Sequence, residues 1–317
     1  MNGSEPKIEI FKPFGEAFEL TKRILFQPFD LTKWLVIGFA AFLANLSGGG
    51  VTGFRPPAGS NWMNHVPMDQ ENVRSFIEQI GPTSAIAIGI GILVLVAMIV
   101  VLAWLSARGR FIFTDCIVRN RAAIVQPWHE YRIEGNNYFV FWLLAAFVII
   151  ALVVAFIILP LVPVFLLGHR DRHIFSGETL LFVLFCIGFF VLMFVFAMLM
   201  QFVMPVMYRR RCKAWPAFLD VVGLFGNYFG PFVLYFLFSI VLGIATVFVV
   251  VAATCATCCI VAIPYLGTVI LLPLFVLLRS FLLCFLRQFG PDYDVWAGIP
   301  QPGPPPIPPS TPPPLPA

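Results

Sequence analysis

Long apolar segments constrain the fold of this chain more than any other feature of its sequence. Of the 317 residues, 60% are hydrophobic and 11% are charged, a composition that excludes both a disordered chain and a pair of ordinary soluble domains. A membrane-spanning helix needs about 20 mainly apolar residues, because in hydrocarbon every backbone N–H and C=O must be bonded within the helix. Six segments satisfy this requirement, so the sequence predicts an all-α, polytopic membrane protein. The predicted spans cover about residues 31–46, 84–107, 138–167, 180–207, 228–254 and 265–289.

The basic residues are distributed unevenly between the two sides of this six-helix domain, residues 31–289. Sixteen of the 20 Lys and Arg residues fall on the side of the N-terminus, and four fall on the other side. Because basic residues near span ends are retained in the cytoplasm, both termini are predicted to be cytoplasmic. Residues 1–30 then form a cytoplasmic amphipathic segment. Residues 290–317 form a cytoplasmic, disordered tail, since 11 of the last 18 residues are proline.

Short aromatic motifs recur next to the predicted spans. Arg119 is followed nine residues later by Trp128, and Arg287 is followed nine residues later by Trp296. Trp215 follows a comparable basic stretch that begins at Arg209. This recurrence predicts three copies of one unit, in which a cytoplasmic amphipathic helix accompanies a helical hairpin.

Two of these segments carry apolar residues at helical spacing. They are Phe14, Ala17, Phe18, Thr21 and Leu25 near the N-terminus, and Trp215, Phe218, Leu219, Val222 and Phe225 before the fifth span. Two interpretations are open: such helices lie in the headgroup region with their aromatic faces toward the acyl chains, or they pack on the protein's own cytoplasmic rim. In the first interpretation the interfacial anchors are Trp128, Tyr131, Trp215, Phe218 and Trp296.

The same motifs carry a resemblance to known proteins. Trp-x-x-aromatic occurs at Trp128 and Trp215, Gly-Asn at Gly135 and Gly226, and a closing Phe-Leu-Arg-Gln-Phe-Gly-Pro-Asp-Tyr ends at Tyr293. In these features the chain resembles uncharacterised bacterial multi-pass proteins similar to the membrane domain found with glycerophosphodiester phosphodiesterases. The resemblance implies a helical fold in the bacterial inner membrane. A catalytic barrel would need about 250 further residues, so phosphodiesterase activity is not expected.

Four polar residues fall within or beside the spans and form a candidate intramembrane site: Arg110, Asp115, Gln201 and Arg279. Ionisable groups in a span cost several kcal/mol unless they are paired or hydrated, so each is a functional candidate. Arg110, Gln201 and Arg279 each lie eight or nine residues before a basic residue at a predicted cytoplasmic span end, which places them at similar depths. They form either a buried cationic site for an anionic ligand such as a lipid phosphate, or ordinary pairs with Asp115 and helix-end carbonyls.

Asp115 has two interpretations of its own. A carboxylate at a helix interface can couple transport to protons, but an acid flanked by Arg110 and Arg119 is more often their counter-ion.

Two patterns resemble metal sites. Cys255, Cys258 and Cys259 form a CxxC with an added cysteine, but no histidine or charged residue lies nearby in sequence, and a disulfide among them remains open. His169 and His173 have the i, i+4 spacing of zinc ligands, yet the arginines between them would repel a cation. We therefore expect no metal and no cofactor.

The sequence carries no catalytic constellation, because no acid pair, His-rich cluster or Ser/Lys pair falls at a common depth. It also has no basic folded module for nucleic acid. The leading interpretation is a non-enzymatic membrane module that engages lipid, with anionic headgroups as its partner, or a protein partner. The alternative is a transporter of small solutes or lipid with a polar site in the bundle.

Overall fold

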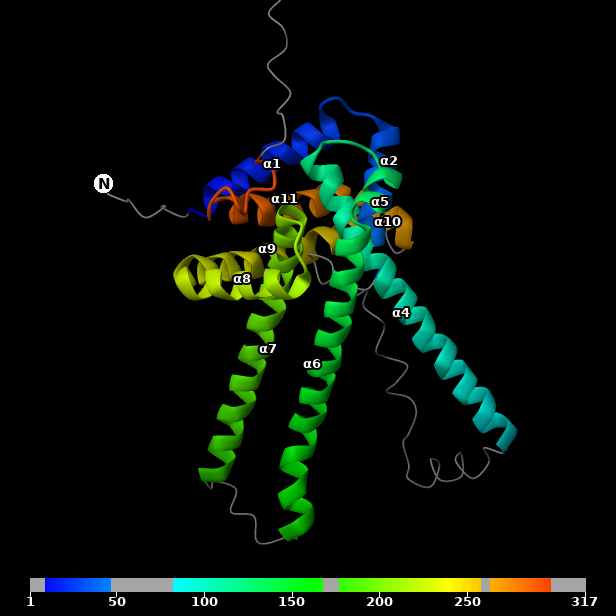
Figure 1. Ribbon diagram of the computed structural model, residues 1–317, viewed down its shortest axis with the longest axis vertical. Coiled ribbons are helices and arrows are strands. Elements are labelled where there is room, and N and C mark those ends of the chain that lie inside the picture. The colour runs from blue at the N-terminus through cyan, green and yellow to red at the C-terminus, as the bar shows by residue number, and fades with distance from the viewer. Residues whose placement is uncertain (1–8, 47–81, 168–176, 258–262, 298–317) are drawn as a thin grey trace, which may run out of the picture.

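The computed structural model describes residues 9–46, 82–167, 177–257 and 263–297, and this part of the chain forms helices and no strands. Figure 1 shows three long helices that extend from a compact helical body at one end of the molecule. The helices are α1 (Phe11–Phe26), α2 (Leu31–Asn45), α4 (Pro82–Val118), α5 (Val125–Glu130), α6 (Arg132–Leu167), α7 (Gly177–Arg210), α8 (Ala214–Asn227), α9 (Phe229–Ala256), α10 (Pro264–Ile270) and α11 (Leu272–Arg287).

Four helices are long and apolar enough to cross a membrane. In the described residues these stretches are Ile86–Val118, Arg132–Ile158, Val183–Arg210 and Phe229–Ala256. The predicted all-helical fold is therefore confirmed for the described residues, and its four long apolar helices are consistent with a helical membrane protein. The first predicted span forms α2, whose 15 residues measure only about 22 Å at 1.5 Å per residue, against a hydrocarbon thickness of about 30 Å.

The last predicted span, 265–289, is divided into α10 and α11 at Leu271. Pro273 explains the break, because proline has no N–H to donate to the carbonyl four residues earlier and crowds that carbonyl. That carbonyl belongs to Val269, and it accepts a hydrogen bond from the indole Nε1 of Trp34 at 3.0 Å. A side chain of α2 thus satisfies the backbone group that the break exposes.

The body is organised around α11, which is buried along nearly its whole length. Helix α1 lies beside α11 (Figure 1). An aromatic cluster joins α11 to α7 and α9, and its fully buried members include Phe202, Phe232, Phe281 and Phe285. The core of the protein therefore lies in this body and not between the free ends of the long helices.

Helices α2 and α4 approach so closely that their backbones touch. A Cβ atom added at Gly109 would lie 2.6 Å from the backbone carbon of Leu43. Next to this contact, the Ser106 hydroxyl donates a hydrogen bond to the backbone oxygen of Ala44 at 2.9 Å. Small residues that allow close backbone contact are typical of helix pairs in membranes.

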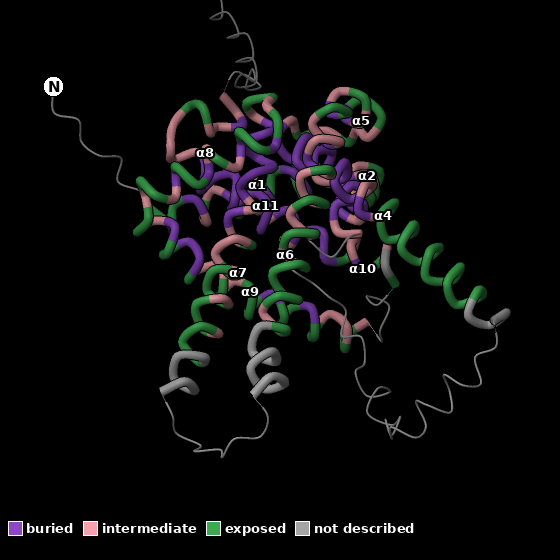
Figure 2. Tube along the Cα trace, turned by 60° about the horizontal axis from the view of Figure 1, so that its bottom comes forward, coloured by how far each residue is buried: buried purple, intermediate pink, exposed green. Residues whose placement is uncertain are grey.

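Where α4, α6 and α7 extend from the body, their described side chains are mostly exposed and apolar. Figure 2 shows these described parts largely in green, in contrast to the buried body, and in α4 every described side chain from Ile86 to Val101 is exposed. Apolar side chains that face outward along a long helix are expected where the surroundings are acyl chains.

Candidate polar sites and interfacial helices

Arg279 lies inside the body, with 5% of its surface exposed. Its Nε and Nη2 atoms donate to the hydroxyl oxygen of Thr114 on α4, at 3.1 and 3.0 Å, and Nη2 also contacts the sulfur of Met204 on α7. The Thr114 hydroxyl in turn donates to the backbone oxygen of Arg110 at 2.9 Å. One guanidinium thus connects three helices, and its only described partners are a hydroxyl group and a thioether.

Arg110 contributes a second guanidinium to the same region. Its Nη1 donates to the phenol oxygen of Tyr138 on α6 at 2.7 Å, and the Thr114 hydroxyl links the Arg110 backbone to the Arg279 guanidinium. We call Arg110, Thr114, Tyr138 and Arg279 the interior arginine site. In the described residues, no carboxylate lies within ion-pair distance of Arg279.

The sequence placed Gln201 in this interior as well, and the structure does not bring it there. The Gln201 amide nitrogen contacts the sulfur of Met198 on its own helix, at 3.3 Å. Met204, three residues farther along α7, reaches Arg279 instead. Sequence reasoning also missed Thr114 and Tyr138, although Thr114 follows Arg110 at i+4 and therefore lies on the same face of α4.

Asp115 faces another side of α4 and is fully buried at the base of a charged cluster. Its carboxylate pairs with Arg119 at 3.1 Å and with Arg121 at 2.9 Å, and it accepts a hydrogen bond from the Tyr208 hydroxyl at 3.0 Å. The counter-ion interpretation therefore holds for Arg119. The second described partner is Arg121 and not Arg110, because residues five apart on a helix point in different directions.

A tight turn brings Arg121 back to Asp115. Asn120 lies two residues after the end of α4 and has a φ of 49°, a left-handed conformation that asparagine tolerates better than most residues. The chain then reverses, and the Arg121 amide donates to the backbone oxygen of Cys116 at 3.2 Å. The Asn120 side chain also accepts a hydrogen bond from Lys33 at 2.7 Å, so α2 contributes to this turn.

Glu130 extends the charged cluster to the end of α7. Its carboxylate pairs with Arg119 at 2.8 Å and with Arg211 at 2.5 Å. Burial opposes ionisation of Glu130, but the charges and hydrogen bonds of these two guanidiniums outweigh it and lower the pKa of the carboxyl group. We call Asp115, Arg119, Arg121, Glu130 and Arg211 the rim network; it links α4, α5 and the end of α7.

Three of the five predicted interfacial anchors pack on the protein itself. Tyr131 is buried and stacks on Tyr208, with ring centres 4.9 Å apart. Trp128 and Trp296 are partly buried, and the guanidiniums of Arg108 and Arg287 lie over their rings at 4.8 and 5.8 Å. These three positions therefore follow the second interpretation of the sequence, in which the connecting segments pack on the rim.

The other two predicted anchors belong to α8, which presents apolar residues outward. Trp215 is 61% exposed, Leu219 and Val222 are exposed, and Phe218 is half-buried. The buried face of α8 consists of smaller side chains, Ala214, Ala217, Val221 and Leu224.

The residues at helical spacing near the N-terminus lie on α1, and some of them are buried against the body while others are exposed. Ala17, Thr21 and Leu25 face the body, Phe14 is half-buried, and Phe18 is exposed. These residues of α1 therefore serve mainly to pack the helix on the body.

The chain matches a known protein family. A family model described as "Family of unknown function (DUF7544)" matches residues 9–293. The chain belongs to this family. No curated protein and no solved structure matches it.

The DUF7544 match contains the interior arginine site, the rim network, α1 and α8, and it ends before the proline-rich residues 300–317. Apart from Trp296, the polar and interfacial features described above therefore lie within the family region.

Several sequence predictions fall outside the described residues. His169, His173, Cys258 and Cys259 do so, and the tail does from residue 298 onward. Cys255 lies on an exposed part of α9. Among the described residues of this DUF7544 protein, no group of three or more His, Cys, Asp or Glu side chains could hold a metal ion.

Proposed function

We propose that this DUF7544 protein is a non-enzymatic membrane module that binds anionic lipid headgroups at the membrane face where its compact body lies. The observation that carries the proposal is the position of α8. This helix follows the basic end of the long helix α7 and leaves it in a different direction (Figure 1), with an outward apolar face that contains Trp215.

The chemistry of α8 suits the boundary between headgroups and acyl chains. Arg209, Arg210 and Arg211 end the preceding segment, and Lys213 directly precedes the helix. An amphipathic helix in the interface buries its apolar face among the upper acyl segments, and basic side chains next to it attract anionic phosphates. Because Trp215 has both an apolar ring and an N–H donor, it fits this boundary well.

Helix α1 supports the same location. Phe11, Phe18 and Phe26 are exposed, and the cation Lys22 on the same helix is exposed as well. Exposed aromatic side chains grouped on one helix would be unfavourable in water, whereas a cation beside them suits the headgroup region. The proposed lipid contact therefore includes the N-terminal helix α1, which lies beside α11, as well as α8.

The arrangement in the membrane completes the proposal. We propose six membrane-embedded segments in three hairpins, with the short α2 as the first and the broken pair α10 and α11 as the last. Both termini then lie on the cytoplasmic side of a bacterial inner membrane, as the distribution of Lys and Arg favours. The similarity to membrane domains that accompany glycerophosphodiester phosphodiesterases belongs to this proposal.

Thermal unfolding in nanodiscs tests the lipid function. We expect the wild-type protein to unfold several degrees higher in nanodiscs that contain phosphatidylglycerol than in phosphatidylcholine alone. Replacing both Trp215 and Leu219 by Ser should remove most of this difference. Val125→Ser is the control, because Val125 is also an exposed apolar residue but lies on α5 and outside α8. Equal unfolding temperatures in the two lipids would contradict the proposal and would favour a protein partner for α8.

A second function, transport or binding of a small anion within the bundle, is favoured by Arg279. A buried guanidinium without a carboxylate attracts an anion strongly, and transporters place ligands beside broken helices such as the α10 and α11 pair. Arg279→Leu should leave the protein inserted but change the lipids or anions that it retains in native mass spectrometry. A variant that inserts and retains the same molecules as wild type would rule this function out.

A further inference from the structure

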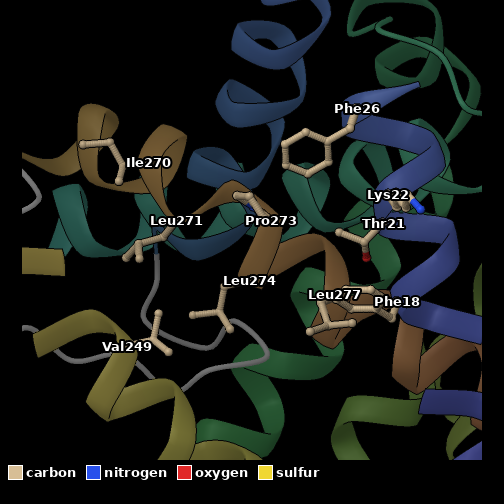
Figure 3. Close-up of a pocket in the computed structure, with 10 residues that line it drawn as sticks. All are labelled: Phe18, Thr21, Lys22, Phe26, Val249, Ile270, Leu271, Pro273, Leu274 and Leu277. Carbon is tan, nitrogen blue, oxygen red and sulfur yellow. The ribbon is translucent and has the colours of Figure 1, made fainter. Parts of the chain in front are cut away.

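A groove runs between α1, α9 and the broken segment formed by α10 and α11. Its volume is about 390 Å³, within the range of about 300–1,000 Å³ that small-molecule sites occupy. Figure 3 shows its lining. Leu274 and Leu277 come from α11, Val249 comes from α9, and Phe18 and Phe26 come from α1. The walls are therefore almost entirely aliphatic and aromatic.

Two polar residues line this groove, and one of them has its hydrogen bond satisfied. The Thr21 hydroxyl donates to the backbone oxygen of Ala17 at 2.8 Å. Lys22 lies at one edge, with its nitrogen directed away from the leucines of α11 (Figure 3). No carboxylate within the described ranges lies within ion-pair distance of Lys22. The groove thus combines an apolar interior with one cation at its edge.

The order of residues on α1 fits an amphiphile. Phe18, Lys22 and Phe26 are spaced by four residues and therefore follow one another along one face of the helix. All three are exposed. A cation between two aromatic rings can hold a phosphate while the rings contact the glycerol region and the start of an acyl chain. Long basic side chains commonly extend to the headgroup level in this way.

We infer that this groove binds one anionic phospholipid, with an acyl chain between α1, α9 and α11 and the headgroup phosphate on Lys22. The apolar walls select a hydrocarbon chain, and the charge of Lys22 selects an anionic headgroup. The inference rests on the proposed lipid function and specifies one site for it. It places that site away from α8, so the two can be tested separately.

The test is lipid titration of the delipidated, full-length protein, followed by native mass spectrometry. The probes are phosphatidylglycerol and phosphatidylcholine with identical acyl chains, and glycerol phosphate as a headgroup without chains. We expect one phosphatidylglycerol molecule to bind about fivefold more tightly than phosphatidylcholine, because its anionic headgroup is attracted by one additional basic side chain. Glycerol phosphate should not compete.

Three variants locate the site. Lys22→Gln should lower phosphatidylglycerol affinity about fivefold and leave phosphatidylcholine affinity unchanged. Lys12→Gln is the matched control, because Lys12 is an exposed lysine of α1 that does not line the groove, and it should change neither affinity. Leu274→Trp fills the groove and should abolish binding of both lipids at this site.

The outcomes separate the alternatives. Equal losses in Lys22→Gln and Lys12→Gln would mean diffuse attraction to the surface and would overturn the inference. Competition by glycerol phosphate would overturn it too, because the site would then recognise a free phosphate. If Leu274→Trp fails to fold, the comparison of the two lysine variants still decides. If Lys22→Gln leaves the phosphatidylglycerol affinity unchanged while the unfolding temperature of the protein still depends on lipid composition, this inference alone is contradicted. If the unfolding temperature does not depend on lipid composition either, the proposed function is contradicted as well.

Discussion

Two neighbouring residues of α4, Thr114 and Asp115, face two regions that hold positive charge in different ways. In the rim network, the carboxylates of Asp115 and Glu130 pair with arginines. In the interior arginine site, Arg279 donates to the Thr114 hydroxyl and contacts a sulfur atom. A paired guanidinium has little attraction left for a ligand. The rim network is therefore suited to joining helices, and the interior site is suited to receiving an anion.

The comparison predicts that the rim network contributes most to stability. Asp115→Ala would leave Arg119, Arg121 and the Tyr208 hydroxyl without their common buried partner. We expect a loss of about 2–4 kcal/mol in the free energy of unfolding, because the buried Tyr208 hydroxyl loses its acceptor and the guanidiniums of Arg119 and Arg121, 31% and 27% exposed, lose a buried counter-ion. Denaturant titration in detergent micelles measures it. Asp115→Asn, which can still accept from Tyr208, should lose less, and a loss under about 1 kcal/mol in Asp115→Ala would mean that the network does not join the helices.

Both regions depend on α4 being held against α2. Gly109→Ala places a Cβ atom 2.6 Å from the Leu43 backbone, and we expect it to cost about 1–3 kcal/mol in unfolding free energy. Gly91→Ala is the matched control on the same helix, because nothing lies within 4 Å of a Cβ atom there. The control should be neutral or slightly stabilising. Equal effects of the two changes would contradict the close contact of α2 and α4.

The interior site should respond in the opposite way to the rim network. Arg279→Met removes a buried charge that no described carboxylate neutralises, so we expect stability to stay within about 1 kcal/mol of wild type or to rise. The same denaturant titration gives the value. A loss as large as that of Asp115→Ala would show that Arg279 is a structural residue and would remove the contrast between the two regions.

The smallest predicted effect concerns pH. The pKa of Glu130 is lowered in the folded protein. Ionised Glu130 therefore contributes fully to the free energy of unfolding at pH values above its pKa in the unfolded chain, about 4.3, and this contribution is lost as the pH falls through the lower pKa of the folded protein. We expect a loss under about 1 kcal/mol for this partly exposed pair. Melting curves between about pH 3 and 6 should show it, and Glu130→Gln should flatten the acid side of the profile. An unchanged profile in that variant would contradict the role of Glu130.

Sequence reasoning reached as far as local periodicity and composition allow. The long apolar helices followed from segment length, and the pairing of Asp115 with Arg119 followed from i, i+4 spacing. The proximity of Arg110 and Arg279 followed from their equivalent depth.

Features that depend on tertiary packing were not predictable in the same way. Arg121 reaches Asp115 only because the chain reverses at Asn120, and the spacing of residues along a helix does not predict that turn. The division of the last span had a local signal in Pro273, but the Trp34 side chain that stabilises it comes from a distant helix. The face of α8 that is buried depends on what α7 and α6 offer as neighbours.

The lipids that remain bound during purification test the central claim most directly. The protein can be extracted from membranes of known composition in a mild detergent, and its co-purified phospholipids measured by mass spectrometry. The account predicts that anionic phospholipids are enriched several-fold over zwitterionic ones, relative to the membrane from which the protein came. Retained lipid with the same composition as that membrane would contradict it.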